Sequence, residues 1–317
     1  MGAFLVRRLS QSVVLLLIVV TIAFFLMHLA PGGPLAVYSL NPSMRIEDLD
    51  RIKQNFGLDR PLPVQYVKWA SGMIRGDWGR SYRDSRPVRT VIFDRLPATL
   101  ELMITALAVA VVVGVLIGIL GAIRQYSLWD FLPTIGAILA LSIPTFWFGL
   151  MVIFLFSERL HWLPSGGIAT TGGTFSVGDR LHHLIAPALV LGFVLVATWS
   201  RYTRAAMLEV IAQDYIRTAR SKGLTERRVI AEHAFRNALA PLVTLGGLQL
   251  AGLFGGALVT ESVFTWPGMG RLFVDSLGYR DYPVMMGILF ITAVLVIIGN
   301  LLADLAVSFL DPRIRRA

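Results

Sequence analysis

Cysteine is absent from this chain of 317 residues, and charged side chains make up only 15% of it. Without cysteine there is no disulfide framework, no thiol nucleophile and no thiolate metal site. The scarcity of charge, with 55% hydrophobic residues and a mean hydropathy of +0.67, excludes an ordinary soluble domain. Several apolar runs are instead long enough to cross about 30 Å of hydrocarbon, which takes about 20 residues in a helix.

The common catalytic and nucleotide-binding motifs are also missing from the sequence. It contains no G-x-x-x-x-G-K-[ST] loop to cradle phosphates, no G-x-S-x-G and no H-E-x-x-H. His161, His182, His183 and His233 have no ligand-like spacing with carboxylates. We therefore expect no catalytic residue, cofactor or metal site on this chain, and any energy it uses must come from a partner.

The apolar runs predict an all-α integral membrane protein with six transmembrane helices. Residues 1–30 form the first helix, 31–99 a large external loop, 100–310 the main transmembrane domain with a polar loop at 201–241, and 311–317 a tail. Pro144 interrupts the third span and predicts a kink. The six expected spans are Ser10–Leu29, Leu100–Ile123, Leu132–Phe156, Ile185–Ser200, Leu242–Ser262 and Pro283–Phe309.

The distribution of lysine and arginine predicts the orientation. The net charge of +9 is explained more simply by basic cytoplasmic loops next to membrane lipid than by nucleic-acid binding. If the N-terminus is cytoplasmic, the cytoplasmic segments hold 14 Lys and Arg and the outside segments 15, of which 11 lie in the loop 30–99. Long loops translocate largely regardless of charge, so the comparison becomes 14 against 4. Both termini are expected in the cytoplasm.

The long loop has helical periodicity of its own. Apolar residues recur every three or four positions from Ser43 to Phe56, Gly57 ends the run, and Pro63–Ile74 predicts another helix. In the spans, Gly114 with Gly118, and Gly252 with Gly256, form small-xxx-small faces that let helix backbones approach each other.

The longest basic stretch between two apolar segments in the second half runs from Asp214 to Pro241. Asp214 is expected to cap a short helix over Tyr215–Lys222, which ends at Gly223 in the left-handed conformation. Thr225 is expected to cap a second helix. Eight residues do not persist alone as a helix in water, and the small Thr218 and Ala219 at its centre suit close packing in a groove of another protein.

This arrangement resembles the cytoplasmic coupling loop, or EAA motif, of ABC importer permeases. Ala219 and Gly223 match the general motif, whereas Arg217 and Thr218 stand in place of Glu and Ala, and Pro241 lies further downstream than the motif's proline. The variant YIRTARSKGL followed by HAFRNALAP looks like that of the B-type subunits of dipeptide, oligopeptide and nickel permeases. The segments GDWGRSYRDSRPV, HWLPSGG, TWPGMG, RDYP and DPRIRR also look like segments of that family, so the resemblance covers nearly the whole chain.

The resemblance implies a type I ABC importer permease in a bacterial cytoplasmic membrane. It would move peptides, or a related solute such as nickel, by alternating access. Its partners would be a second permease subunit, two ATPase subunits that carry ATP and Mg, and an external binding protein. The loop 30–99 would be a docking surface for that protein, or merely a lid over helix ends. The residues expected to contact the ATPases are Tyr215, Arg217, Thr218, Ala219, Lys222, Gly223 and Leu224.

Ionisable residues in the spans leave two further readings open. Such groups are costly in hydrocarbon and invite a functional interpretation. Glu261, near the outer end of the fifth span, is a candidate for lining the pathway, and Glu101 is expected to lie near Arg95 in a structural role. A stand-alone channel or secondary transporter would be expected to have internal repeats and broken helices with coupling-ion ligands. An intramembrane enzyme would need a catalytic pair, and the polar loop favours a cytosolic partner instead.

Overall fold

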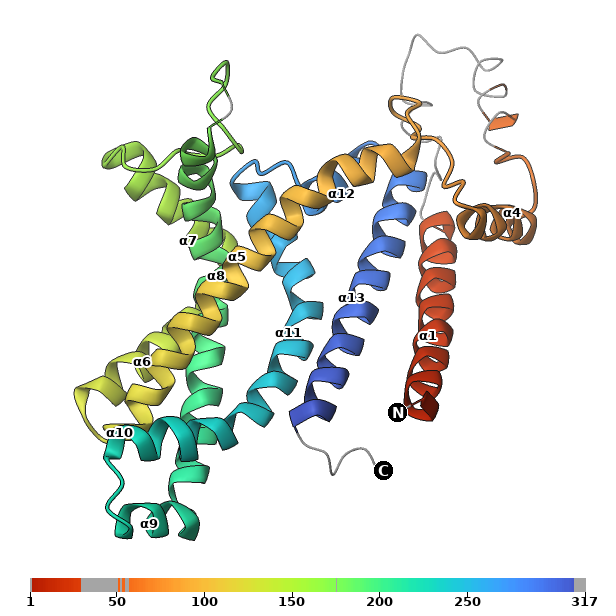
Figure 1. The fold of residues 1–317 in the computed structure, drawn as a ribbon. Coiled ribbons are helices and arrows are strands. Elements are labelled where there is room, and N and C mark those ends of the chain that lie inside the picture. Colours follow the sequence, from red (N-terminus) through yellow and green to blue (C-terminus); the bar gives the residue numbers. More distant parts are fainter. Residues whose placement is uncertain (1, 30–50, 52, 55–56, 175, 311–317) are drawn as a thin grey trace. The chain divides into compact units, whose positions relative to one another are not determined.

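The structure is a computed structural model that describes residues 2–29, 51, 53–54, 57–174 and 176–310. For 2–5, 248, 250–256 and 307–310 it describes the backbone alone. The described chain is almost entirely helical (Figure 1). Its helices, in order, are α1 Gly2–Leu29, α4 Leu62–Arg75, α5 Val88–Ile123, α6 Leu128–Ser142, α7 Thr145–Val152, η1 Ile153–Arg159, α8 Val177–Ile211, α9 Asp214–Ser221, α10 Glu226–Arg228, η2 Val229–Phe235, α11 Arg236–Val263, α12 Met269–Gly278 and α13 Tyr282–Leu310.

Within the described residues, four helices are long and apolar enough to cross a membrane, or five if the bent pair α6 and α7–η1 is one span. The four are α1, α5, α8 and α13. Helix α11 has 28 residues, which is also sufficient in length to cross a membrane. Helices cover the expected spans except at Ile143 and Pro144 in the third, and α5 and α8 begin well before theirs.

The third expected span is two helices rather than one kinked helix. Helix α6 ends at Ser142, Ile143 is extended with φ −86° and ψ 126°, and α7 starts after Pro144 at an angle of 106°. Proline lacks an N–H for the helix ladder and biases the preceding residue toward extended backbone. The break therefore lies where Pro144 predicted a kink, but the change of direction is much larger than a kink.

The chain divides into two compact units, 1–97 with 268–298, and 98–267 with 299–317. In the first, Phe24 of α1 packs against Tyr66 and Trp69 of α4, and the Tyr66 hydroxyl lies 2.6 Å from Thr21 Oγ1. The expected helix Pro63–Ile74 is confirmed as α4. The predicted helix Ser43–Phe56 lies almost wholly outside the described residues.

Two segments singled out in the sequence meet at Asp281 in the first unit. Asp281, in the turn before α13, is buried and accepts hydrogen bonds from Ser81 Oγ at 2.5 Å and from the Tyr82 N–H at 3.1 Å. The Arg83 guanidinium lies over the Tyr279 ring, 4.0 Å from its centroid. The motifs RDYP and GDWGRSYRDSRPV are therefore parts of one folded corner.

The second unit is built on close contact between α5 and α8. A Cβ at Gly114 would lie 2.6 Å from Trp199 Cβ, and one at Gly118 would lie 2.5 Å from Thr203 Cβ. Real side chains do not approach so closely, so only glycine permits this contact, as the small-xxx-small pattern predicted. The second predicted pair, Gly252 and Gly256, lies outside the residues whose surroundings are described.

Candidate functional site

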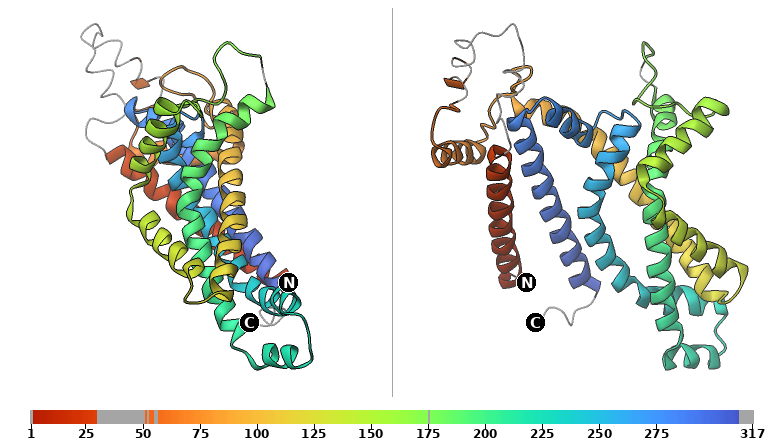
Figure 2. Two further views of the ribbon diagram at one scale, coloured as in Figure 1. Left: turned by 90° about the vertical axis from the view of Figure 1, so that its left-hand side faces the viewer. Right: turned by 180° about the vertical axis from the view of Figure 1, so that it is seen from behind.

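The basic stretch forms a short helix set off from the long ones. After α8 ends at Ile211, the chain forms α9 and returns into a continuous helical run through α10, η2 and α11 (Figures 1 and 2). Much of the expected loop 201–241 is thus helical, and the turn-rich part is short. Helix α9 starts one residue earlier than expected, with Gln213 and not Asp214 at the capping position. Asp214 instead lies 3.7 Å from the exposed Arg217 guanidinium.

Gly223 ends this helix as the sequence predicts. Its φ is +76°, and its N–H donates to the carbonyl of Arg220 at 3.0 Å. A left-handed residue at this place turns the chain out of the helix and satisfies a terminal carbonyl. Thr225 is at the capping position of α10, although its side chain makes no capping hydrogen bond.

One face of α9 is packed into the protein itself. Ile216 is fully buried and Ala219 is 6% exposed, and both contact a cluster that includes Met207 of α8 and Val229 and Ala234 of η2. Ala219 was expected to contact an ATPase subunit, and in this structure it packs against its own chain. The small side chain is needed because α9 lies close against α8 and η2 of its own chain. Ala219 therefore helps to hold α9 in place.

The remaining candidates lie on α9 and directly after its end at Ser221. Tyr215, Arg217, Thr218, Lys222 and Gly223 are exposed, while Leu224 is half-buried against the same cluster as Ala219. The Thr218 hydroxyl donates to the Asp214 carbonyl at 3.0 Å and stays on its own helix. An aromatic ring and two cations therefore face outward from a helix whose inner face is fixed.

An ion pair closes the turn between α9 and α10. Arg220 donates to Glu226 through two nitrogens, at 2.7 and 3.1 Å. Hydrogen bonding to the guanidinium lowers the pKa of Glu226 below its ordinary value and raises the pKa of Arg220. Arg228 and Glu232 form a second pair one turn later at 2.9 Å. The first pair spans the turn, and the exposed Arg217 and Lys222 take part in neither pair.

Glu261 is buried and accepts a hydrogen bond from Thr99 Oγ1 at 2.7 Å. Its carbonyl accepts the N–H of Trp266, whose indole donates to the Ala98 carbonyl at 2.8 Å. The side chain thus ties the end of α11 to α5. A role for Glu261 in the pathway stays a prediction, and its geometry is that of a structural link.

Two ion pairs join elements that are far apart in the sequence. Glu101 of α5 pairs with Arg180 of α8 through both carboxylate oxygens, a structural contact between two helices. Buried Asp130 of α6 accepts from Arg204 of α8 at 2.5 and 2.9 Å and from the Tyr126 N–H at 3.1 Å. Sequence reasoning did not pair Asp130 with Arg204. The usable signal was a lone acid and a pair of arginines at the same predicted end of two spans.

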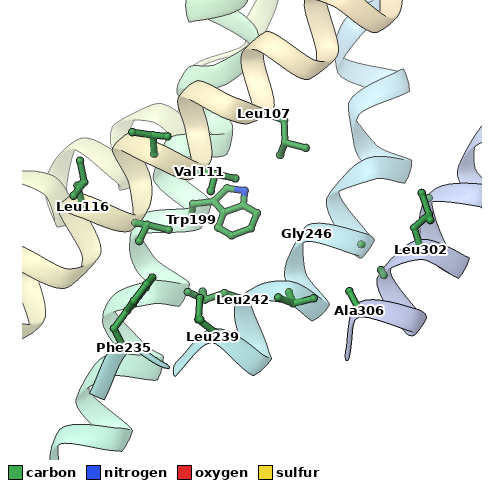
Figure 3. A pocket seen from close by; sticks show the side chains of 16 residues that line it. Leu107, Val111, Leu116, Trp199, Phe235, Leu239, Leu242, Gly246, Leu302 and Ala306 are labelled. Atoms are coloured by element: carbon green, nitrogen blue, oxygen red, sulfur yellow. The ribbon is translucent and has the colours of Figure 1, made fainter. Parts of the chain in front are cut away.

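An apolar cavity of about 630 Å³ opens between the helices of the second unit (Figure 3). Trp199, Leu107 and Val111 line it from α8 and α5, and Leu242, Gly246 and Leu302 line it from α11 and α13. All the residues that line it are apolar, so it offers no acid, base or metal ligand. Among the described residues, no group of three or more His, Cys, Asp or Glu side chains could hold a metal ion.

Two family models and several known proteins match this sequence. The model for binding-protein-dependent transport system inner membrane components matches residues 114–316, and the model for the N-terminal part of such components matches residues 1–103. The oligopeptide transport system permease protein AppB of Bacillus subtilis (strain 168) is 44% identical over 99% of both chains. The dipeptide transport system permease protein DppB of Escherichia coli (strain K12) is 37% identical over 98% of both.

A solved structure shares the fold. A chain of the MetNI methionine ABC transporter, in an inward-facing conformation, aligns with a TM-score of 0.57 at 19% identity, covering 72% of this chain and 99% of its own. The helical architecture is therefore that of the ABC importer permeases. The chain belongs to the family of binding-protein-dependent transport system inner membrane components.

Proposed function

We propose that this chain is the transmembrane subunit of an ATP-driven importer of peptides. The identity of 44% and 37% to proteins named as oligopeptide and dipeptide permeases, over nearly their whole length, supports peptides as the solute. ATP would be hydrolysed by partner subunits, since this sequence has no phosphate-cradling loop. A second permease subunit would complete the pathway, and an external binding protein would deliver the solute. ATP can shift access only through its different affinity for the two states.

The observation that carries the coupling proposal is the two-faced helix α9. Ile216 and Ala219 hold it on the chain's own core, and Tyr215, Arg217 and Lys222 face outward. Aromatic and arginine side chains are enriched among residues that dominate binding energy at interfaces. We assign the outward face to the ATPase subunit, which is a narrower surface than the seven residues expected from the motif.

Substitutions on the two faces of α9 test this assignment. Tyr215→Ala with Arg217→Ala should leave thermal unfolding unchanged and weaken ATPase co-purification by about 30-fold, corresponding to about 2 kcal/mol. Ala219→Arg should lower the unfolding temperature, because the long side chain must enter the chain's own core. Arg124→Ala is the matched control, since Arg124 lies in the turn before α6, where its guanidinium lies over the Trp129 ring. Wild-type uptake and co-purification in the outward double variant would refute the coupling role of α9.

The solute is tested separately. The complete transporter, purified with its binding protein, should release short peptides when denatured, as identified by mass spectrometry. Isolation of a metal ion or a non-peptide solute in stoichiometric amount would contradict the peptide assignment and leave the coupling assignment intact.

A further inference from the structure

A second cavity, of about 370 Å³, lies in the unit formed by residues 1–97 and 268–298. Its walls come from the end of α1, from the segment before α4, from α4 and the turn that follows it, and from the start of α13. Figures 1 and 2 show α4 across the end of α1 that is remote from the N-terminus. In the orientation expected from the charge distribution, this end is external. The volume is in the range of small-ligand sites.

Aromatic side chains make up much of the lining of this cavity. They include Phe24, Trp69, Trp78, Tyr82 and Tyr282. The rings of Phe24 and Trp69 lie 5.4 Å apart, and Thr21 and the hydroxyl of Tyr66 fix α4 against α1 beside them. Aromatic walls with a few charged groups at the mouth are typical of sites that bind small organic molecules.

Charged side chains of both signs line the same cavity. Lys68, Arg60 and Arg80 contribute the cations, and Asp77 contributes the carboxylate. Arg80 donates to the Ser85 carbonyl at 2.9 Å, whereas Lys68 and Arg60 form no ion pair with any described residue. The Asp77 Oδ1 atom accepts the Gly79 N–H at 3.1 Å, and Asp77 is exposed and lines the cavity.

The turn after α4 is built to present Asp77 and Trp78 at this place. Gly76 has φ +81° and Gly79 has φ +77°, both in the left-handed region that favours glycine. The Asp77 N–H donates to the Gly72 carbonyl at 2.9 Å, and a Cβ at Gly72 would lie 2.8 Å from the Asp77 carbonyl oxygen. The chain therefore folds back tightly on α4, and this closeness depends on glycine.

We propose that this cavity binds both charged ends of a short peptide before it enters the membrane pathway. Lys68 and Arg60 bind the terminal carboxylate, Asp77 binds the terminal ammonium, and the aromatic wall packs against the peptide. Because the lining has three cations and one carboxylate, neutral and acidic peptides bind more tightly than basic ones. The assignment rests on the proposed function, since peptides are its solute.

The test uses the full-length chain with its co-expressed partner subunits, in lipid nanodiscs and without the binding protein. Equilibrium binding is measured with radiolabelled tri-alanine, with its N-acetylated form and with its C-amidated form. The variants are Lys68→Gln and Asp77→Asn, the latter of which keeps the acceptor for the Gly79 N–H. Arg75→Gln is the matched control, because Arg75 is exposed on the same helix and does not line the cavity.

In the wild type, blocking either end should weaken binding about tenfold, or ~1.4 kcal/mol. In Lys68→Gln, C-amidation of the peptide should no longer weaken binding, whereas N-acetylation should still weaken it. In Asp77→Asn, acetylation should no longer weaken binding, whereas amidation should still weaken it. Arg75→Gln should match the wild type. Equal responses in all variants, or no binding by the wild type, would overturn the assignment.

ATP-dependent uptake of tri-alanine, with the binding protein restored, separates this inference from the proposed function. If uptake is normal but the variants bind the three peptides with the same affinities as the wild type, the peptide subsite alone is overturned. Absence of any peptide uptake overturns the proposed function, even where the binding pattern follows the charges.

Discussion

Two glycines four residues apart on α5 set how closely α8 can approach. At Gly118 an added Cβ would lie 2.5 Å from Thr203 Cβ and 2.6 Å from the Ser200 carbonyl oxygen. One of these atoms is backbone, so a rotamer change cannot relieve the clash. Gly136 on α6 has nothing within 4 Å of its added Cβ. The same residue type thus has a packing role in one helix and none in the other.

Replacement of these glycines by alanine should therefore have opposite effects. Gly118→Ala should destabilise the protein by about 1–3 kcal/mol, as expected for overpacking of a close contact. Gly136→Ala should stabilise it by about 0.5–1 kcal/mol, because alanine has the better helix propensity. Thermal unfolding in detergent measures both. A Gly118→Ala protein as stable as Gly136→Ala would mean that α5 and α8 are not in this contact.

At the scale of elements, α9 is held by an inner apolar face and by an ion pair at its end. Arg220 and Glu226 have side chains that are 42% and 56% exposed, so solvent screens their attraction. The contribution is then at most about 1 kcal/mol. Because the ion pair joins residues on either side of one turn, its effect should appear as slower hydrogen exchange of α9 amides rather than as a change in global stability.

The pH dependence of that protection follows from the lowered pKa of Glu226. A carboxyl whose pKa is lower in the folded state contributes stability above its unfolded value, ordinarily 4.5, and loses it as the pH falls through the folded pKa. Hydrogen exchange of α9 amides should be faster in Glu226→Gln than in the wild type at pH 7. The two proteins should converge well below pH 4.5. A difference that persists in acid would assign the effect to shape rather than charge.

At the scale of the whole molecule, orientation follows from charge. The basic loop around α9 is expected in the cytoplasm, and the loop between η1 and α8 outside. Thr171 and Ser221 are exposed residues of these two regions. Because the chain has no cysteine, a single introduced thiol can report its own side without background.

We therefore expect Thr171→Cys to react with a membrane-impermeant maleimide in intact cells. Ser221→Cys should react only after the cells are permeabilised. The cysteine-free wild type is the control in both conditions. Labelling of Ser221→Cys in intact cells would reverse the orientation, and α9 could not then contact a cytosolic ATPase.

The sequence alone determined the features that depend on local chemistry. Long apolar runs specify helices, glycine at 223 permits φ +76°, and Pro144 removes a ladder hydrogen bond where α6 ends. The glycines at 114 and 118 predict a close contact with another helix, without identifying that helix. Each of these effects acts within one or two turns of chain, so composition and spacing are enough to infer it.

Only the tertiary structure decided which side chains meet. Ala219 turned inward because α9 rests on Met207 and Val229, and no spacing within eight residues distinguishes a chain's own core from a partner's groove. Glu261 bonds to Thr99, 162 residues away in the sequence, and Asp130 bonds to Arg204, 74 residues away. Such pairings depend on how each helix is rotated and how far it is shifted along its neighbour. Those two quantities are set by packing across the whole unit rather than by the residues of one helix.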